Sequence, residues 1–378
     1  MVGKAYPTVS IREEGMRDGL QIEDKDISSA DKIRLLDLLS ETGLKEIVIG
    51  SFVSPKYTPQ MRNTEEVASG FTPKPGVRYT ALIPNERGRE RAAPFKNKLS
   101  VANEGTPSLG VHMCDVFTKR NWNRSQAQEI AAWPARIEDA KARGVAEASL
   151  SAAAPWGSNF TGPVPLETLM DMLARQHALW DEAGIPVTTC GFADPMSWNM
   201  PHLVENTIRA IKQRWPHIIK WRLHIHDGRG MAVASIYAAL RVLGSEEHLH
   251  VDTAIGGIGG CPYCGNGRAT GMAPTEDVVH MLDDMGIETG IDMTRLIEAV
   301  WVLEEILGRR AMGHVSKAGP RPRGKALYDP NMPFVETFEH ATHFLRGPEV
   351  YSDAIVPWTS PIESDQLKEV AGIQRSVS

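Results

Sequence analysis

Short apolar runs alternate with longer segments of helical periodicity over most of the chain. The runs typical of buried strands are TVSIRE (8–13), EIVIGSF (46–52), RYTALI (78–83), SLGVHM (108–113), EASLSA (147–152), PVTTCGF (186–192), KWRLHIH (220–226) and HLHVDTA (248–254). A helical stretch is expected after each run, and strict alternation of strands and helices is typical of a parallel sheet. Eight such units over roughly 280 residues predict an α/β fold, a closed (β/α)₈ TIM barrel.

The helices between these strands are predicted from apolar spacing and from terminal residues. They are expected over 28–43, 63–70, 125–143, 165–184, 201–214, 231–244 and 291–308, with a further helix capped by Thr275-Glu276-Asp277. The first has Ser28 or Ser29 as its N-cap and ends at Gly43. Residues 86–107 are expected to be irregular.

An open, doubly wound sheet is the alternative architecture. That fold binds dinucleotides through a Gly-rich turn after its first strand, whereas the turn here reads Glu14-Gly15-Met16-Arg17-Asp18-Gly19. The barrel is therefore preferred. After Met312 the composition shifts to Pro, Gly and basic residues, so residues 1–310 are predicted to form the catalytic barrel and 311–378 a C-terminal extension on the barrel or at an oligomer contact.

Composition and charge exclude several functional classes. The formal net charge of −6 favours neither nucleic acid nor an anionic membrane as partner. The N-terminus lacks the apolar core of a secretory signal, and no apolar run approaches the ~20 residues that span a bilayer. Four cysteines in 378 residues do not form a disulfide scaffold, so a reduced, cytoplasmic location is expected. The expected partners are a small-molecule substrate and further copies of the chain, in a homodimer or larger homo-oligomer.

Candidate catalytic residues follow from the fold, because barrel enzymes place them at the carboxyl ends of strands. This rule selects Glu13 to Asp18, Ser51, Asn85, Asp115, Asp194, His224 to Asp227 and the Gly-rich loop after the eighth strand.

The pair His224 and His226 is the most informative local pattern. Residues i and i+2 of a strand point to the same side, so both imidazoles are expected to face the barrel mouth. A single strand histidine more often packs or forms a hydrogen bond, but two at this spacing, together with Asp18, favour a metal site. One carboxylate and two imidazoles suit Mg²⁺, Mn²⁺, Zn²⁺ or Fe²⁺ alike.

Arg17 precedes the candidate ligand Asp18. A guanidinium beside a metal ion can stabilise an enolate or hydroxyl oxygen. The competing interpretation is a structural Arg–carboxylate pair at the barrel rim.

Cys261-Pro262-Tyr263-Cys264 has the spacing of a dithiol redox motif. A redox cysteine pair needs its first thiol at a helix N-terminus, whereas glycines flank this motif, so redox catalysis is disfavoured. A zinc site would need further ligands, and Cys114 and Cys190 are isolated. Cys261 is instead interpreted as a proton donor on a flexible loop over the barrel mouth.

Several motifs together resemble the 3-hydroxy-3-methylglutaryl-CoA lyase family. They are GMRDGLQIE (15–23), SFVSPKYTPQM (51–61), LIPNERG (82–88), FTKRN (117–121), HIHDGRG (224–230), GGIGGCPY (256–263) and TEDVV (275–279). The resemblance implies a carbon–carbon lyase that cleaves a 3-hydroxy-3-alkyl acyl-CoA to acetyl-CoA and a 3-oxo acid by a retro-Claisen reaction. It also implies a divalent metal, Mg²⁺ or Mn²⁺ ahead of Zn²⁺.

The same resemblance implies roles for individual residues. Asp18, His224 and His226 correspond to the metal ligands, Arg17 to the residue that steadies the enolate oxygen, and Cys261 to the proton-transfer cysteine. Glu13 and Asp194 match further positions near the catalytic centre. Gln21, Ser51, Asn85 and Lys119 are the expected substrate-binding residues.

Two positions depart from the family pattern. Val48 stands where an acidic residue is usual, and Met272 stands near the place of an asparagine ligand. Asn266 in the longer loop is the candidate fourth ligand, with water in its place or a different metal as the alternatives. These departures leave two other hypotheses open, namely an aldolase or condensing enzyme acting on a 2-oxo or hydroxy acid, and a non-catalytic barrel with a degenerate metal site.

Overall fold

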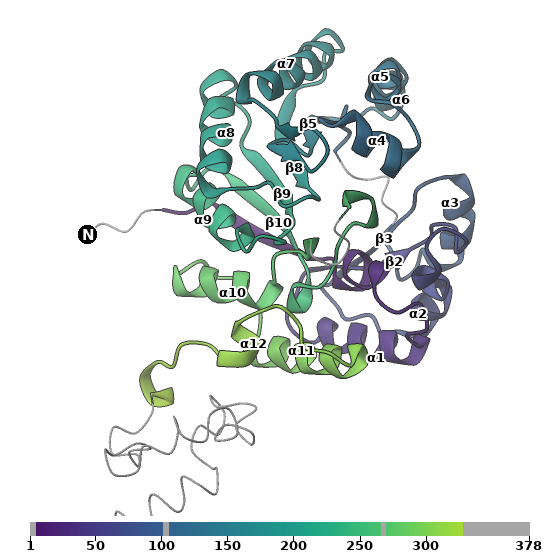
Figure 1. Cartoon of the computed structure of the whole chain (residues 1–378), viewed down its shortest axis with the longest axis vertical. Coiled ribbons are helices and arrows are strands. Elements are labelled where there is room, and N and C mark those ends of the chain that lie inside the picture. The colour runs from purple at the N-terminus through teal and green to yellow at the C-terminus, as the bar shows by residue number, and fades with distance from the viewer. Residues whose placement is uncertain (1–4, 101–105, 266–269, 328–378) are drawn as a thin grey trace, which may run out of the picture. The chain divides into compact units, whose positions relative to one another are not determined.

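Eight parallel strands form one sheet, as the apolar pattern predicts (Figure 1). The computed structural model describes residues 5–100, 106–265 and 270–327. The strands are β1 (Thr8–Glu13), β2 (Glu46–Ser51), β3 (Arg78–Leu82), β4 (Val111–His112), β5 (Ala148–Ala153), β8 (Val187–Asp194), β9 (Lys220–Ile225) and β10 (His248–Thr253).

The order of the strands in the sheet is β3-β2-β1-β10-β9-β8-β5-β4. The first strand thus pairs with the last, Thr8 opposite His248 and Glu13 opposite Thr253, which is how a barrel closes. The described residues form no ladder between β3 and β4. The predicted (β/α)₈ barrel is confirmed. A two-stranded antiparallel hairpin, β6 (Gly157–Ser158) and β7 (Gly162–Pro163), lies outside it.

The strands alternate between an apolar and a polar face. In β9, Trp221, Leu223 and Ile225 are buried in the hydrophobic core, whereas Lys220, Arg222 and His224 alternate with them. Since alternate residues of a barrel strand point outward to the helices and inward to the lumen, this barrel has a polar interior. Hydrogen bonds from β1 to β10 along that interior, such as Arg12 to Asp252, confirm it.

Most predicted helices are present. They are α1 (Ser29–Ser40), α2 (Thr64–Gly70), α7 (Leu166–Glu182), α8 (Pro201–Arg214), α9 (Ala232–Val242), α10 (Thr275–Asp284) and α11 (Met293–Leu307). Ser28 is the N-cap of α1, and its hydroxyl accepts from the backbone N of Asp31 at 3.0 Å. Thr275 was predicted to cap α10, and this prediction is wrong. Pro274 holds the N-cap position, and Thr275 is the first residue of the helix.

The predictions between β3 and β5 were wrong in detail. Residues 86–107 are not wholly irregular, since they contain α3 (Glu86–Ala92) and a 3₁₀ turn (Ala93–Phe95). The single helix expected over 125–143 is two helices, α5 (Gln126–Ala131) and α6 (Trp133–Ala142), and α4 (Asp115–Trp122) precedes them. Pro134 explains the break, because a proline has no N–H for the helix ladder and favours the first turn of a helix.

The chain divides into two compact units, Met1–Met312 and Gly313–Ser378. In the second, the described residues form α12 (Val315–Ala318) and a short turn at Gly324–Ala326.

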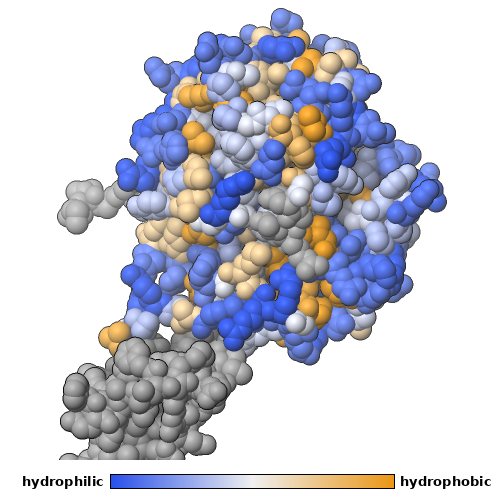
Figure 2. Space-filling view, viewed as in Figure 1, coloured by the Kyte–Doolittle hydropathy of each residue, from blue (hydrophilic) through white to orange (hydrophobic). Residues whose placement is uncertain are grey.

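Throughout the described ranges, every helix is too short or too polar to cross a membrane. On the face shown in Figure 2 the coloured hydrophobic side chains lie in separate small patches among hydrophilic ones. The homo-oligomer stays a prediction.

Candidate active site

Asp18, His224 and His226 come together at the carboxyl ends of β1 and β9. One ligand atom of each lies within 4.8 Å of the other two. Asp18 belongs to a wide helical turn, Gly15–Gly19, directly after β1, and Nε2 of His226 lies 3.5 Å from its Oδ2. The structure thus brings together the three residues predicted as metal ligands.

The Asp18 carboxylate is divided between two environments. Its Oδ1 accepts from Nη1 of Arg17 at 2.9 Å and from Nε2 of Gln21 at 2.6 Å. Its Oδ2 is buried and, among the described residues, has no hydrogen-bond partner. Burial would raise the pKa of Asp18, but the charges of Arg17 and the two histidines lower it. A buried, ionised oxygen without a donor is costly, and a cation bound there removes that cost. The site therefore fits a divalent ion.

Both imidazoles have Nδ1 engaged elsewhere. Nδ1 of His224 lies 2.9 Å from Oδ2 of Asp252, and Nδ1 of His226 contacts the carbonyl oxygen of Thr270. These acceptors fix the proton on Nδ1 and leave Nε2 as the free ligand atom. Burial lowers the pKa of His226 to about 4, so this imidazole is neutral, as a metal ligand must be. For His224, burial is outweighed by the hydrogen bond and charge of Asp252, which raise its pKa.

Glu14, His224 and Asp252 form a second group that could hold an ion. Its carboxylates are already paired, however. Asp252 accepts from Arg12 at 2.8 Å and from Arg222 at 3.0 Å, and Glu14 lies 2.8 Å from Arg12. Since these oxygens have donors and Oδ2 of Asp18 has none among the residues that the structure describes, the Asp18 group is the better candidate.

Arg17 is fixed between two carboxylates. Its Nε and Nη2 lie 2.8 and 2.7 Å from Oε2 of Glu14, and its Nη1 binds Asp18. This pairing agrees with the structural interpretation of Arg17, and it also holds a guanidinium next to the metal ligands.

Glu13 and Asp194 are both fully buried. Oε1 of Glu13 accepts from the backbone N of Gly15 at 2.7 Å and of Ile255 at 2.9 Å, and Oε2 accepts from Thr275 at 2.5 Å. Burial raises the pKa of Glu13 to about 7. Glu13 therefore joins β1 to the loop after β10 and to α10.

Asp194 is the last residue of β8, which pairs with β9, the strand of His224. Its Oδ2 accepts from the backbone N and Nδ2 of Asn199 at 2.6 and 2.8 Å, while its Oδ1 is buried without a partner in the described part of the chain. Nδ2 of Asn199 also donates to the carbonyl of His226, so Asp194 is linked to a metal ligand. Burial raises the pKa of Asp194.

The residues predicted to bind substrate are placed differently from one another. Gln21 contacts Asp18, whereas the buried Ser51 hydroxyl donates to the carbonyl of Leu82 at 3.3 Å. Asn85 caps α3, and the exposed Lys119 pairs with Asp115 on α4. The substrate-binding roles stay predictions.

The loop after β10 covers the metal residues. A Cβ on Gly259 would lie 3.5 Å from Oδ2 of Asp18, so the loop backbone passes directly beside the carboxylate, with a φ of +123° that favours glycine. The backbone N of Cys261 donates to Oγ1 of Thr270 at 2.9 Å, and Cys261 is half-buried. Asn266 lies outside the described residues.

The two residues that depart from the family pattern, Val48 and Met272, are both buried. Val48 lies in β2 opposite Thr80 and is 4% exposed, and Met272 is completely buried. The backbone of Met272 forms an antiparallel bridge with that of His226. Met272 thus supports the histidine through its backbone.

Sequence reasoning missed Asp252, which orients His224. It follows His248 and His250 at two-residue intervals in HLHVDTA, so all three share one strand face. This spacing could have predicted that Asp252 lies on the same polar strand face as the two histidines.

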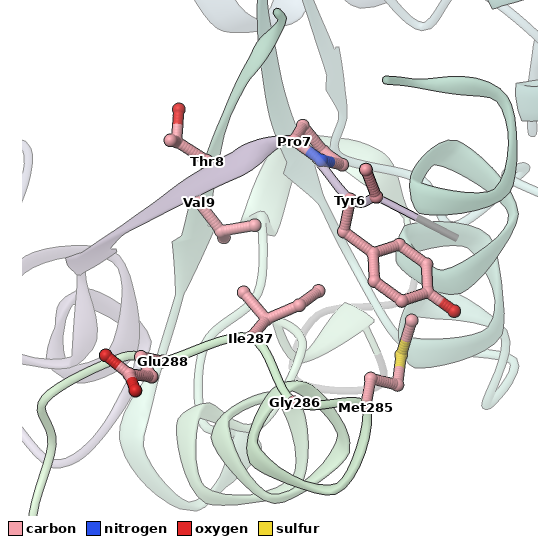
Figure 3. A pocket seen from close by; sticks show the side chains of 9 residues that line it. Tyr6, Pro7, Thr8, Val9, Met285, Gly286, Ile287 and Glu288 are labelled. Atoms are coloured by element: carbon pink, nitrogen blue, oxygen red, sulfur yellow. The ribbon is translucent and has the colours of Figure 1, made fainter. Parts of the chain in front are cut away.

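A separate cavity lies away from these residues, at the other end of β1. This cavity of about 530 Å³ is lined by residues 5–9 and 285–288. Figure 3 shows Tyr6, Val9, Met285 and Ile287 around it, at the amino end of β1. Because barrel enzymes react at the carboxyl ends of strands, this hollow is not the catalytic site.

Comparison with known proteins agrees with this geometry. The profile of the family described as HMGL-like matches residues 8–302. The chain belongs to the HMGL-like family. Hydroxymethylglutaryl-CoA lyase of Bacillus subtilis is 35% identical over 305 residues, covering 80% of this chain and 95% of that protein. The human mitochondrial hydroxymethylglutaryl-CoA lyase is 32% identical over 317 residues, 84% of this chain and 91% of its own.

A solved structure extends the comparison. An HMG-CoA lyase from Acinetobacter baumannii, in complex with coenzyme A and 3-methylmalate, superposes with a TM-score of 0.67 at 30% identity. The match covers 85% of this chain and 97% of that one. The resemblance inferred from the motifs is therefore confirmed for this member of the HMGL-like family.

Glu276 of this HMGL-like barrel carries a further buried carboxyl. It is fully buried, its Oε2 accepts from the backbone N of Gly256 at 2.9 Å, and its Oε1 has no partner within the described ranges. Burial raises the pKa of Glu276 to about 8. The folded chain therefore holds a proton that the unfolded chain releases at a lower pH.

The replacement Glu276→Gln should flatten the dependence of stability on pH. The stabilisation from the bound proton is fully present below about pH 4.5 and is lost as the pH rises through about 8. Between pH 5 and 8 the free energy of unfolding of the parent should fall by on the order of 3 kcal/mol relative to that of the variant, as measured by urea unfolding. The exposed control Glu138→Gln should follow the parent. Parallel profiles for parent and Glu276→Gln would contradict the buried proton.

Asp252→Asn should weaken metal binding by about 10–100-fold, because the amide lacks the negative charge that holds the proton on Nδ1 of His224. Calorimetric titration with Mn²⁺ measures this, with circular dichroism to check the fold. Ser10→Ala is the control, since Ser10 contacts His248 and His250 in the same interior but not His224. Equal affinities for parent and Asp252→Asn would remove Asp252 from the site.

Proposed function

We propose that this chain is a carbon–carbon lyase that cleaves 3-hydroxy-3-methylglutaryl-CoA, or a close 3-hydroxy-3-alkyl acyl-CoA, to acetyl-CoA and a 3-oxo acid. The observation that carries the proposal is the buried Oδ2 of Asp18, which lies beside His226 and has no hydrogen-bond partner in the described part of this HMGL-like chain. Relatives named hydroxymethylglutaryl-CoA lyase, 32–35% identical over most of their length, support the substrate class. They do not favour the aldolase or the non-catalytic barrel.

Asp18, His224 and His226 would hold the ion, Mg²⁺ or Mn²⁺, through Oδ2 and the two Nε2 atoms. When bound, a divalent ion supplies Lewis-acid polarisation of substrate oxygens. Zn²⁺ accepts the same ligands, so the choice of Mg²⁺ or Mn²⁺ is part of the proposal.

The chain's own residues supply the proton transfers and charge stabilisation. Asp194, with one buried oxygen free of partners in the described residues, is the proposed base for the 3-hydroxyl proton. The raised pKa that burial gives Asp194 suits a general base. Loss of that proton breaks the C–C bond and leaves the enolate of acetyl-CoA.

Arg17 and Cys261 act on that enolate. The guanidinium of Arg17, fixed by Glu14 and Asp18, offsets the charge on the enolate oxygen. The thiol of Cys261, on the loop that passes beside Asp18, gives a proton to the enolate carbon.

Release of acetyl-CoA from 3-hydroxy-3-methylglutaryl-CoA tests the proposal. The parent should turn over with Mg²⁺ or Mn²⁺, and His226→Ala should reduce kcat/KM by more than about 100-fold, since a metal ligand is lost. Cys261→Ala should slow turnover but keep its metal affinity.

The exposed control Lys141→Ala, on α6, should retain full turnover. Absence of acetyl-CoA at every metal concentration would contradict the lyase assignment, and full activity in His226→Ala would contradict the ligand set.

A further inference from the structure

Two thiols of the loop after β10 are held close together by the backbone. The backbone N of Cys264 donates to the carbonyl of Cys261 at 3.1 Å and closes a turn over Pro262–Cys264. Such an i to i+3 turn keeps the two Cα atoms within about 7 Å. Disulfides need Cα separations of about 4.4–6.8 Å, so the backbone already has a spacing suited to a bond.

The two cysteines differ in environment. Cys261 is half-buried and reachable from solvent, whereas Cys264 is fully buried and packs with Cys114, Phe117 and Met196. The thiol of Cys264 faces the carbonyl of Pro195 at 3.2 Å. It also forms a hydrogen bond to Cys261, which lowers the pKa of Cys261 and raises that of Cys264. Cys261 is therefore the more nucleophilic thiol, with Cys264 next to it.

The turn is also tethered from outside the loop. Nε of Arg120, on α4, donates to the carbonyl of Tyr263 at 2.9 Å, between the two cysteines. Cys114 and Cys190 are buried, so a peroxide reaches the half-buried Cys261 first. Cys264 is the thiol that is hydrogen-bonded to Cys261, whereas the sulfur of Cys114 accepts from the backbone N of Phe117, and burial raises the pKa of Cys190. Oxidation should thus be confined to the 261–264 turn.

We propose that Cys261 and Cys264 are an oxidative modification site, at which a reversible disulfide switches the enzyme off. The bond removes the thiol of Cys261 from the position where the proposed function uses it as a proton donor. The loss of activity therefore rests on the proposed function, whereas formation of the bond does not.

A hydroperoxide is the oxidant. The sulfur of Cys261, as thiolate, attacks the terminal peroxide oxygen, the O–O bond breaks, and the displaced oxygen takes up a proton to leave as an alcohol or water. Cys261 is then a sulfenic acid. The sulfur of Cys264 attacks that of Cys261, the S–S bond forms, and the S–O bond breaks. The hydroxide that leaves takes the Cys264 proton and becomes water. A dithiol reverses the reaction by disulfide exchange.

The test treats the full-length, Mn²⁺-loaded protein with one equivalent of hydrogen peroxide. Intact-mass measurement should show a loss of about 2 Da, and a non-reducing peptide map should place the bond between Cys261 and Cys264. Lyase activity should fall in proportion to the oxidised fraction and return with dithiothreitol. A chain that gains one or more oxygens without forming the bond would overturn the proposal.

Cys264→Ser is the decisive variant, since serine keeps a donor to Pro195 while removing the second sulfur. It should keep its activity before oxidation, lose no mass of about 2 Da with peroxide, and form a dimedone adduct at Cys261. Cys190→Ser is the matched control and should behave like the parent. A bond that still forms in Cys264→Ser would overturn the assigned pair.

The two proposals fail separately. A parent without lyase activity would contradict the proposed function, while the mass readout would still decide whether the disulfide exists. An active parent that forms the disulfide with no loss of turnover would overturn the switch.

Discussion

The carboxylate of Asp252 is the interaction on which the polar interior of the barrel depends. It is fully buried, and it accepts from Arg12 of β1, from Arg222 and His224 of β9 and from His250 of β10. These contacts hold its pKa well below the ordinary range. Removing one partner of such a buried set typically costs about 3–5 kcal/mol, because a charge is left without compensation.

This one carboxylate links fold and site. It ties three neighbouring strands together and, through Nδ1 of His224, sets which nitrogen of that histidine is free. Glu13 also links separate segments, at the mouth of the barrel, where it joins β1, the loop after β10 and the start of α10. The start of the loop is thereby held near Asp18, and Cys261 lies farther along the same loop. Catalytic geometry thus follows from buried polar contacts that also close the barrel.

Much of the fold could be predicted from local patterns. The burial alternation of β9 and the two-residue spacing of His224 and His226 both follow from strand geometry, and both are found. Helices without an apolar stripe were not predictable in this way. In α3, ERGRERA, a cap from Asn85 and the Arg91–Glu65 ion pair stabilise the helix in place of apolar burial.

The pairing of His224 with Asp252 lies beyond local patterns. The two residues are Cα partners in neighbouring strands, which depends on the register of β9 against β10. The period of a strand gives the face of each side chain but not this register. The close approach of Gly259 to Asp18 depends in the same way on contacts between distant segments.

The proposed chemistry requires that Asp18, His224 and His226 hold one divalent ion. The most direct measurement is a crystal structure of the Mn²⁺-soaked protein with anomalous diffraction. We expect a single strong peak about 2.0–2.3 Å from Oδ2 of Asp18 and from Nε2 of both histidines. A peak between Glu14 and Asp252, or no peak at the carboxyl ends of β1 and β9, would contradict it.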